Sequence, residues 1–135
     1  MRARSALGVA LLALVAPASA QTACPVALQP WSRIELHLGL GLPGGGVVSR
    51  AQFRNFLEGT VTPRFPDGYT VLEATGNYRY KSGKIAAEPA RVLVILTKAP
   101  DEAARRVEEI VRIYKARFRQ ESVGRTQRIE CAAFE

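Results

Sequence analysis

The stretch that decides the fold of this chain is WSRIELHLGL, residues 31–40. Every second residue from position 34 onward is aliphatic, and the positions between them carry Glu35, His37 and Gly39. A two-residue period is typical of a strand that buries one face and leaves the other in solvent. The stretch therefore predicts a half-buried strand that presents Glu35 and His37 on its outward face.

The residues after this strand predict five further elements. A glycine-rich loop at residues 41–48 leads to a helix that opens with the capping-box sequence SRAQ, residues 49–52. The other elements follow in this order: strands at residues 69–80 and 91–98, a long helix that opens at residues 99–102, and a last strand at residues 122–134. The order strand, helix, strand, strand, helix, strand predicts an α+β, ferredoxin-like βαββαβ fold. In that fold two helices cover one face of a four-stranded antiparallel sheet.

The first 20 residues carry the pattern of a secretory signal peptide. Arg2 and Arg4 precede an apolar run at residues 6–16, and the small residues ASA at positions 18–20 form a cleavage motif. The run is too short to cross a bilayer as a helix, and no later segment approaches the ~20 apolar residues that a span requires. We therefore predict an exported chain, periplasmic or extracellular, without a transmembrane segment.

Three segments are predicted on this basis: a signal peptide at residues 1–20, an N-terminal extension tied by a disulfide at residues 21–30, and a single ferredoxin-like domain at residues 31–135. The length left after cleavage suits one domain with one core. Cys24 lies shortly after the cleavage motif, so the alternative to a free exported chain is a lipid anchor at Cys24.

Cys24 and Cys131 are the only cysteines of the chain. Disulfides form and persist outside the cytoplasm, and the predicted topology brings the end of the last strand to the start of the first, where these residues lie. We therefore predict that Cys24 and Cys131 form a disulfide. Two cysteines and the single histidine, His37, do not supply the four ligands of a Cys/His zinc site, so no metal is expected.

The chain is basic, with 19 Lys and Arg against 12 Asp and Glu and a formal net charge of +7. The charges are spread along the sequence without a run of about five of one sign, which is typical of a solvated mixed surface. RNA-recognition domains share the predicted topology but stack bases on aromatic residues of their third strand, and residues 91–98 contain none. We therefore expect no nucleic-acid partner.

Four segments of the chain resemble a known family: ELHLGLG at residues 35–41, TPRFPDGYTV at 62–71, ATG at 74–76 and YKARFRQESV at 114–123. They are similar to segments of the bacterial exported family called domain of unknown function 3574. The resemblance covers nearly all of the predicted mature chain. It implies export, in some members through a lipid anchor, and a ferredoxin-like sheet, and it implies no catalytic residue.

The outward face of the first strand is the strongest candidate for a site. Glu35 and His37 both project from it. The last strand, its expected neighbour, adds Arg125 or Arg128, depending on register, and the second strand adds residues from further across the sheet. The candidate ligand-binding residues on this face are Glu35, His37, Glu73, Arg79 and Arg128.

A carboxylate beside an imidazole holds the ring in one tautomer and raises its pKa. Such a pair suits general-base catalysis or the binding of a small anionic ligand, so His37 and Glu35 are the candidate catalytic residues. The alternatives are a polar solvated face and one half of a dimer interface. The residues leave enzyme, binding site and interface open, and a non-enzymatic role is favoured.

The glycines at residues 39–44 match the pattern G-x-G-x-x-G between a strand and a helix. A dinucleotide site requires the helix N-terminus directly at the pyrophosphate, but residues 45–48 separate this pattern from the predicted helix. We interpret the loop as a flexible rim and predict no cofactor.

The run VLVIL at residues 92–96 is typical of a central strand covered on two sides. Leu93 and Ile95 are expected to point outward as an apolar patch, which usually marks an interface. We therefore predict an exported binding or interaction domain that forms a homodimer through its open sheet face. The alternative is an enzyme or small-ligand sensor of the dimeric α/β-barrel type that uses His37 and Glu35. A third hypothesis is attachment to an anionic envelope surface through the basic second helix.

Overall fold

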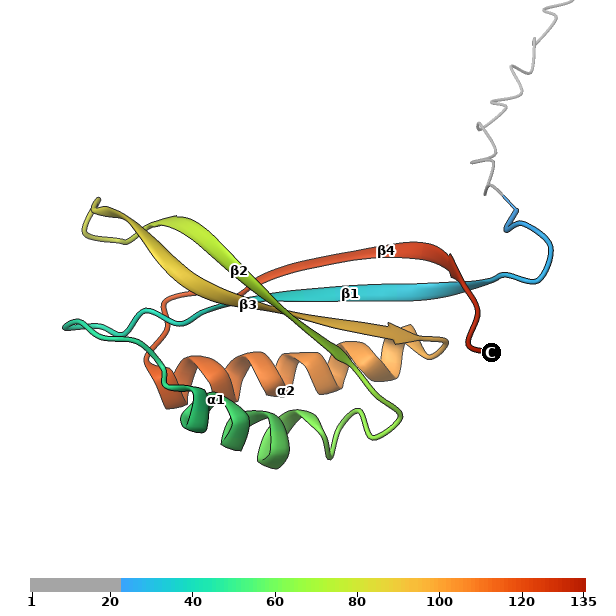
Figure 1. Cartoon of the computed structure of the whole chain (residues 1–135), viewed down its shortest axis with the longest axis horizontal. Helices are drawn as coiled ribbons and strands as arrows, with labels where there is room; N and C mark the ends of the chain where they lie inside the picture. The colour runs from blue at the N-terminus through green and yellow to red at the C-terminus, as the bar shows by residue number, and fades with distance from the viewer. Residues whose placement is uncertain (1–22) are drawn as a thin grey trace, which may run out of the picture.

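The computed structural model describes residues 23–135, and the predicted signal peptide lies outside these residues. One four-stranded sheet forms the upper layer of the molecule and two helices lie below it, as Figure 1 shows. The elements in chain order are β1 (Gln29–Gly39), α1 (Arg50–Phe56), the π-helical segment η1 (Leu57–Val61), β2 (Thr70–Arg79), β3 (Ile85–Thr97), α2 (Pro100–Phe118) and β4 (Gly124–Ala132).

The strands are arranged in the order β2-β3-β1-β4, and all neighbours are antiparallel. β1 therefore lies between β3 and β4, with the last strand beside the first. Both helices cover the same face of this sheet (Figure 1). The predicted ferredoxin-like fold is confirmed in its element order, its strand order and the placement of its helices.

The core forms where the inward face of β1 meets the helices. Three residues of β1 have no exposed surface: Ile34, Leu36 and Leu38. Phe56 of α1 and Tyr114 of α2 belong to the same core, and their ring centroids lie 5.0 Å apart. The Tyr114 hydroxyl donates a 2.7 Å hydrogen bond to the carbonyl oxygen of Gly39. Burial raises the pKa of Tyr114, so this donor stays protonated and fastens α2 to the end of β1.

The first helix begins at the predicted capping box. The Ser49 hydroxyl accepts a 3.1 Å hydrogen bond from the Gln52 amide, and the Gln52 side chain accepts a 2.8 Å bond from the Ser49 amide. At its other end α1 continues into η1, which is followed by Thr62 and Pro63. None of the helices among residues 23–135 is long and apolar enough to cross a membrane.

The third strand is longer than predicted, because β3 begins at Ile85 rather than at residue 91 and contains Pro89. The Pro89 carbonyl accepts a 2.9 Å hydrogen bond from the Leu40 amide, at the point where β1 ends. The carbonyl and amide of one residue in an antiparallel strand point to the same side, so the missing N–H of Pro89 faces the end of β1 and not β2. The proline therefore leaves the pairing of β3 with β2 intact.

The predicted outward position of Leu93 and Ile95 is wrong. The register pairs both with buried residues of β1, and both are themselves fully buried in the core between sheet and helices. The residues of this run that face outward instead are Val92, Val94 and Leu96. A run that is apolar at every position shows no alternation between apolar and polar residues. Its sequence therefore does not indicate which side faces the helices, and the register with β1 decides it.

The predicted disulfide between Cys24 and Cys131 is present, and the two Cα atoms lie 5.5 Å apart. Cys131 lies opposite Pro30 in the pairing of β4 with β1. The bond thus ties the segment before β1 to the end of β4 across a sequence separation of 107 residues. A cross-link over such a span removes many conformations from the unfolded chain.

Replacing Cys24 and Cys131 together by serine is expected to lower the free energy of unfolding by about 4 kcal/mol while the fold persists, because the unfolded chain regains this freedom. Urea unfolding of the oxidised parent and of the double variant, followed by circular dichroism, measures the difference. No measurable loss would show that other contacts, such as the packing of Phe134 on Trp31, hold the two ends together.

Candidate functional site

The face of the sheet away from the helices, the open face, is divided lengthwise into two halves. The register sets this division, because Glu35 lies opposite Val94 in β3 and opposite Thr126 in β4. The charged half lies over β1 and β4 and is made up of Arg33, Glu35, His37, Arg128 and Glu130. The apolar half lies over β3 and β2 and is made up of Leu72, Val92, Val94 and Leu96.

Glu35 is the centre of an ion-pair network in the charged half. Its Oε1 atom accepts a 2.7 Å hydrogen bond from Nε of Arg33, and Nη1 of Arg128 lies 3.7 Å from the same oxygen. Arg33 also lies 3.4 Å from a carboxylate oxygen of Glu130. The hydrogen bond from Arg33 is the main cause that lowers the pKa of Glu35, and the charges of both arginines add to it. The carboxylate therefore stays ionised at neutral pH.

His37 lies next to this network without a hydrogen bond to it. Its Nε2 atom is 3.9 Å from Oε2 of Glu35, which is too long for a hydrogen bond. The His37 side chain is 49% exposed, and Gly124 on β4 leaves room beside it. The structure thus brings Glu35, His37 and Arg128 together as predicted, but the arginines hold the carboxylate and the imidazole does not.

Glu73 and Arg79 lie on the face that the helices cover, not on the open face. Paired residues of neighbouring strands share one face of the sheet, and Glu73 is paired with Arg91, which is paired with the buried Leu38. Arg79 lies on the same face as Glu73, because the two are an even number of residues apart in β2. Glu73 forms a 3.0 Å ion pair with Arg91. Arg125, by the same register argument, belongs to the helix side of β4. The sequence of β2 lacks strict alternation, so its pattern does not show which residues point outward.

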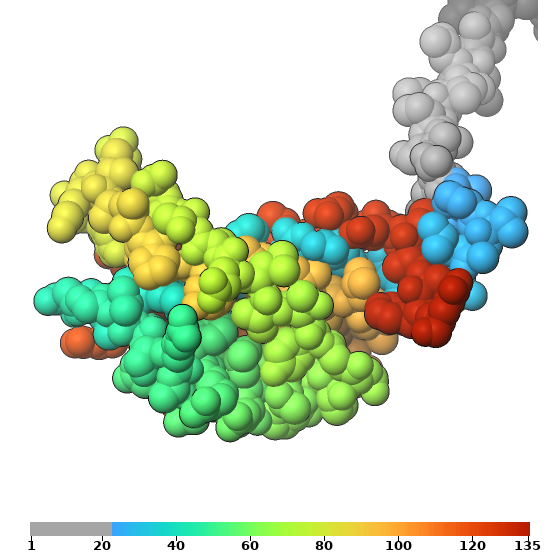
Figure 2. All heavy atoms as spheres, viewed as in Figure 1, coloured from blue at the N-terminus to red at the C-terminus, as the bar shows by residue number. Residues whose placement is uncertain are grey.

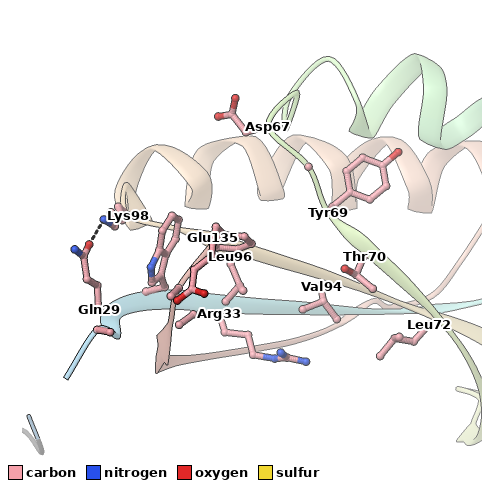
Figure 3. Close-up of a pocket in the computed structure, with 16 residues that line it drawn as sticks. Gln29, Arg33, Asp67, Tyr69, Thr70, Leu72, Val94, Leu96, Lys98 and Glu135 are labelled. Carbon is pink, nitrogen blue, oxygen red and sulfur yellow. Dashed lines mark hydrogen bonds between the residues drawn. The ribbon is translucent and has the colours of Figure 1, made fainter. Parts of the chain in front are cut away.

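A hollow of about 940 Å³ lies over one end of the open face, and Figure 3 shows the residues around it. The apolar half contributes Leu72, Val94 and Leu96 to its lining. Trp31 and the C-terminal tail form another part, where the Phe134 ring packs edge-on against Trp31 with centroids 5.0 Å apart. No sequence pattern indicated this hollow, because only the fold brings the tail to the first strand.

A smaller hollow of about 280 Å³, the hairpin pocket, lies where β1 ends. Figure 2 shows the β2–β3 hairpin, in yellow, standing above the glycine-rich loop, in teal. The polar and aromatic residues that line the pocket include His37, Tyr78, Tyr80, Glu88, Gln120, Glu121 and Ser122. The Ser122 hydroxyl donates a 3.0 Å hydrogen bond to the Tyr78 hydroxyl, and Glu121 accepts a 3.1 Å bond from the Lys81 amide. These bonds join the turn after α2 to the hairpin.

The glycine-rich loop folds into a small hairpin before α1. The glycines at residues 44–46 have positive φ angles, and a bridge between Gly41 and Val47 closes the loop. Helix α1 begins at Arg50, several residues after the G-x-G-x-x-G pattern ends. Within residues 23–135, no three or more His, Cys, Asp or Glu side chains are grouped so as to hold a metal ion.

Replacing Arg33 by glutamine is expected to raise the pKa of Glu35 toward that of an ordinary glutamate, because the hydrogen bond that favours the ionised form is lost. A carbon NMR titration of the side-chain carboxyl groups measures this pKa directly. Arg125→Gln is the matched control, since Arg125 lies on the other side of the sheet and its loss should leave the pKa unchanged.

The same network has a defined effect on stability. The pKa of Glu35 is lower in the folded than in the unfolded chain, so its contribution is complete above the unfolded pKa and is lost as pH falls through the folded pKa. The Arg33→Gln variant should therefore lose part of the acid dependence of its unfolding free energy. An unchanged Glu35 pKa in this variant would contradict the network.

The fold is similar to that of two solved structures of phage SAM lyase. The structure in complex with S-methyl-5'-thioadenosine has a TM-score of 0.60 and 13% sequence identity, and the match covers 86% of this chain and 97% of that chain. The structure in the apo state has a TM-score of 0.55 and 14% identity, over 78% of this chain and 91% of that chain. At this identity the likeness shows a shared fold alone.

The comparison with curated proteins finds no significant match in sequence. The family model described as "Protein of unknown function (DUF3574)" matches residues 33–134, nearly the whole of the domain. This match confirms the resemblance that the four sequence segments indicated. The chain therefore belongs to the DUF3574 family of proteins of unknown function.

Proposed function

We propose that this protein is an exported, non-catalytic interaction domain that forms a homodimer through the open face of its sheet. The observation that carries the proposal is the apolar half of that face. Leu72 is 46% exposed there and lies in register with Val92, which borders His37 on β1. Val92 and Leu96 beside it are partly exposed, whereas Val94 is buried. A partly exposed apolar strip beside charged residues is typical of a surface that a partner covers.

A second copy of the chain is the partner that the charges of the open face fit. Arg33 and Arg128 alternate with Glu35 and Glu130 in the charged half, so this group carries no net charge. A two-fold axis brings the same surface of both copies together. The apolar halves can then cover each other, while arginines of one copy face carboxylates of the other.

Export is part of this proposal. It is supported by the predicted signal peptide at residues 1–20 and by the Cys24–Cys131 disulfide, a bond that persists outside the cytoplasm. The sulfur of Cys24 carries either a disulfide or a thioether-linked lipid, so the disulfide-bonded form has no lipid anchor at this residue. In the proposed mature chain, residues 21–30 form the tied extension and residues 31–135 the single domain.

The alternative, an enzyme or small-ligand sensor that uses His37 and Glu35, receives less support from the geometry. Glu35 is engaged by Arg33 and Arg128 and is not hydrogen-bonded to His37. Both guanidinium groups already face carboxylates, which makes the cluster a poor site for an anionic ligand. The likeness to phage SAM lyase, at 13% identity, adds no lyase activity to the proposal.

The substitution Leu72→Glu is expected to convert the dimer to a monomer, because the interface would then bury two unpaired carboxylates. We expect the dissociation constant to rise at least about a hundredfold. Sedimentation equilibrium at several protein concentrations measures it.

Ile129→Glu is the matched control. Ile129 is 67% exposed but lies on the helix side of the edge strand β4, so this variant should remain a dimer. The proposal fails if the parent protein stays monomeric at millimolar concentration, or if Leu72→Glu, still folded by circular dichroism, associates as the parent does.

A further inference from the structure

We infer that the hairpin pocket binds a small organic ammonium ion, a function that goes beyond the proposed dimerisation. The pocket lies where β1 ends, away from the hollow beside the C-terminal tail. Its lining brings together two tyrosine rings, a partly buried carboxylate and a floor of small residues. Each feature favours a compact cation over an anion or a large ligand.

The two tyrosine rings form an aromatic corner. Tyr78 and Tyr80 are nearly perpendicular, with an interplanar angle of 87° and ring centroids 5.2 Å apart. Hydrogen bonds hold both hydroxyl groups: Ser122 donates to Tyr78 at 3.0 Å, and Tyr80 donates to Glu88 at 2.9 Å. The bond to Glu88 raises the pKa of Tyr80, so its hydroxyl remains a donor. Fixed aromatic faces of this kind attract ammonium groups through their π electrons.

Glu88 supplies a negative charge beside these rings. It is partly buried, and no Lys or Arg side chain in the part of the chain that the structure describes forms an ion pair with it. Arg91, on the same strand, pairs with Glu73 on the other face of the sheet. Glu121 adds a second carboxylate to the lining. In a chain whose net charge is +7, this pocket is a local site of negative charge.

Two glycines at the end of β1 make room for the carboxylate. A Cβ atom at Gly39 would lie 2.6 Å from Oε1 of Glu88, and one at Gly41 would overlap with Oε2. A larger residue at either position would require the Glu88 carboxylate to move. The first two glycines of the G-x-G-x-x-G pattern thus lie directly against the Glu88 carboxylate.

The dimensions of the pocket limit the ligand to a few heavy atoms. The residues without large side chains that line it are Gly39, Ala74, Gly76, Ala90 and Gly124. Its volume of about 280 Å³ falls below the ~300–1,000 Å³ of sites for drug-sized molecules. A trimethylammonium group is small enough for a pocket of this volume. His37, which also lines the pocket, can hydrogen-bond a hydroxyl group on the ligand.

The test compares choline with 3,3-dimethylbutan-1-ol, which has the same shape without the charge. Amide NMR spectra of the disulfide-bonded protein are recorded during titration with each compound. Choline should shift the signals of residues around the pocket, Gly39 and Gly124 among them, whereas the neutral alcohol should not. Glu88→Gln, which keeps the side-chain shape, should weaken choline binding at least about tenfold, because the ammonium loses its countercharge.

Glu108→Gln is the control variant, since Glu108 is an exposed carboxylate on α2 and does not line the pocket. Tyr78→Leu removes one ring and keeps the carboxylate. It therefore tests the ammonium site if Glu88→Gln does not fold. The inference is overturned if choline shifts no signals at the pocket, if the neutral alcohol binds equally well, or if a folded Glu88→Gln or Tyr78→Leu variant binds choline as the parent does. Sedimentation of the same samples reports dimerisation separately.

Discussion

Burial of one face of β1 is the constraint on which the rest of the structure depends. Ile34, Leu36 and Leu38 face the helices without exposed surface, and strand geometry then places Glu35 and His37 on the open face. Because β1 pairs with β3 on one side and β4 on the other, its orientation also determines which residues of those strands face the helices. A register shift of one residue on either side would exchange buried and outward residues in the neighbouring strand. The observed register places the ion-pair network and the apolar half on the open face.

β1 runs along the whole length of the open face and contributes residues to different regions at its two ends. Near its start the strand contributes Trp31 to the hollow beside the C-terminal tail, and near its end it contributes His37 and Gly39 to the hairpin pocket. Between them, Arg33 and Glu35 belong to a network of balanced charge. The proposed dimer interface and the inferred ammonium site share His37 but otherwise use different residues of one face.

The helices and the disulfide were predictable because their signals are local or depend only on topology. The Ser49 capping box needs four consecutive residues, and the Cys24–Cys131 pairing needs only that the last strand lies beside the first. The outward faces of β2 and β3 were not predictable in the same way. Leu93 and Glu73 were both expected on the open face, yet both lie on the helix side. Neither strand alternates strictly, so neither carries the period that distinguishes its two faces.

The sequence by itself determined the order of the elements, the faces of β1, the disulfide and the family, because each rests on a pattern of neighbouring residues or on the connectivity of the chain. The tertiary structure alone decided that Arg128 and not Arg125 reaches Glu35, since this depends on the register between strands that are distant in sequence. It also brought Glu88 over Gly39 and beside Tyr80. Such contacts arise from the twist and pairing of strands, and no period along the chain encodes them.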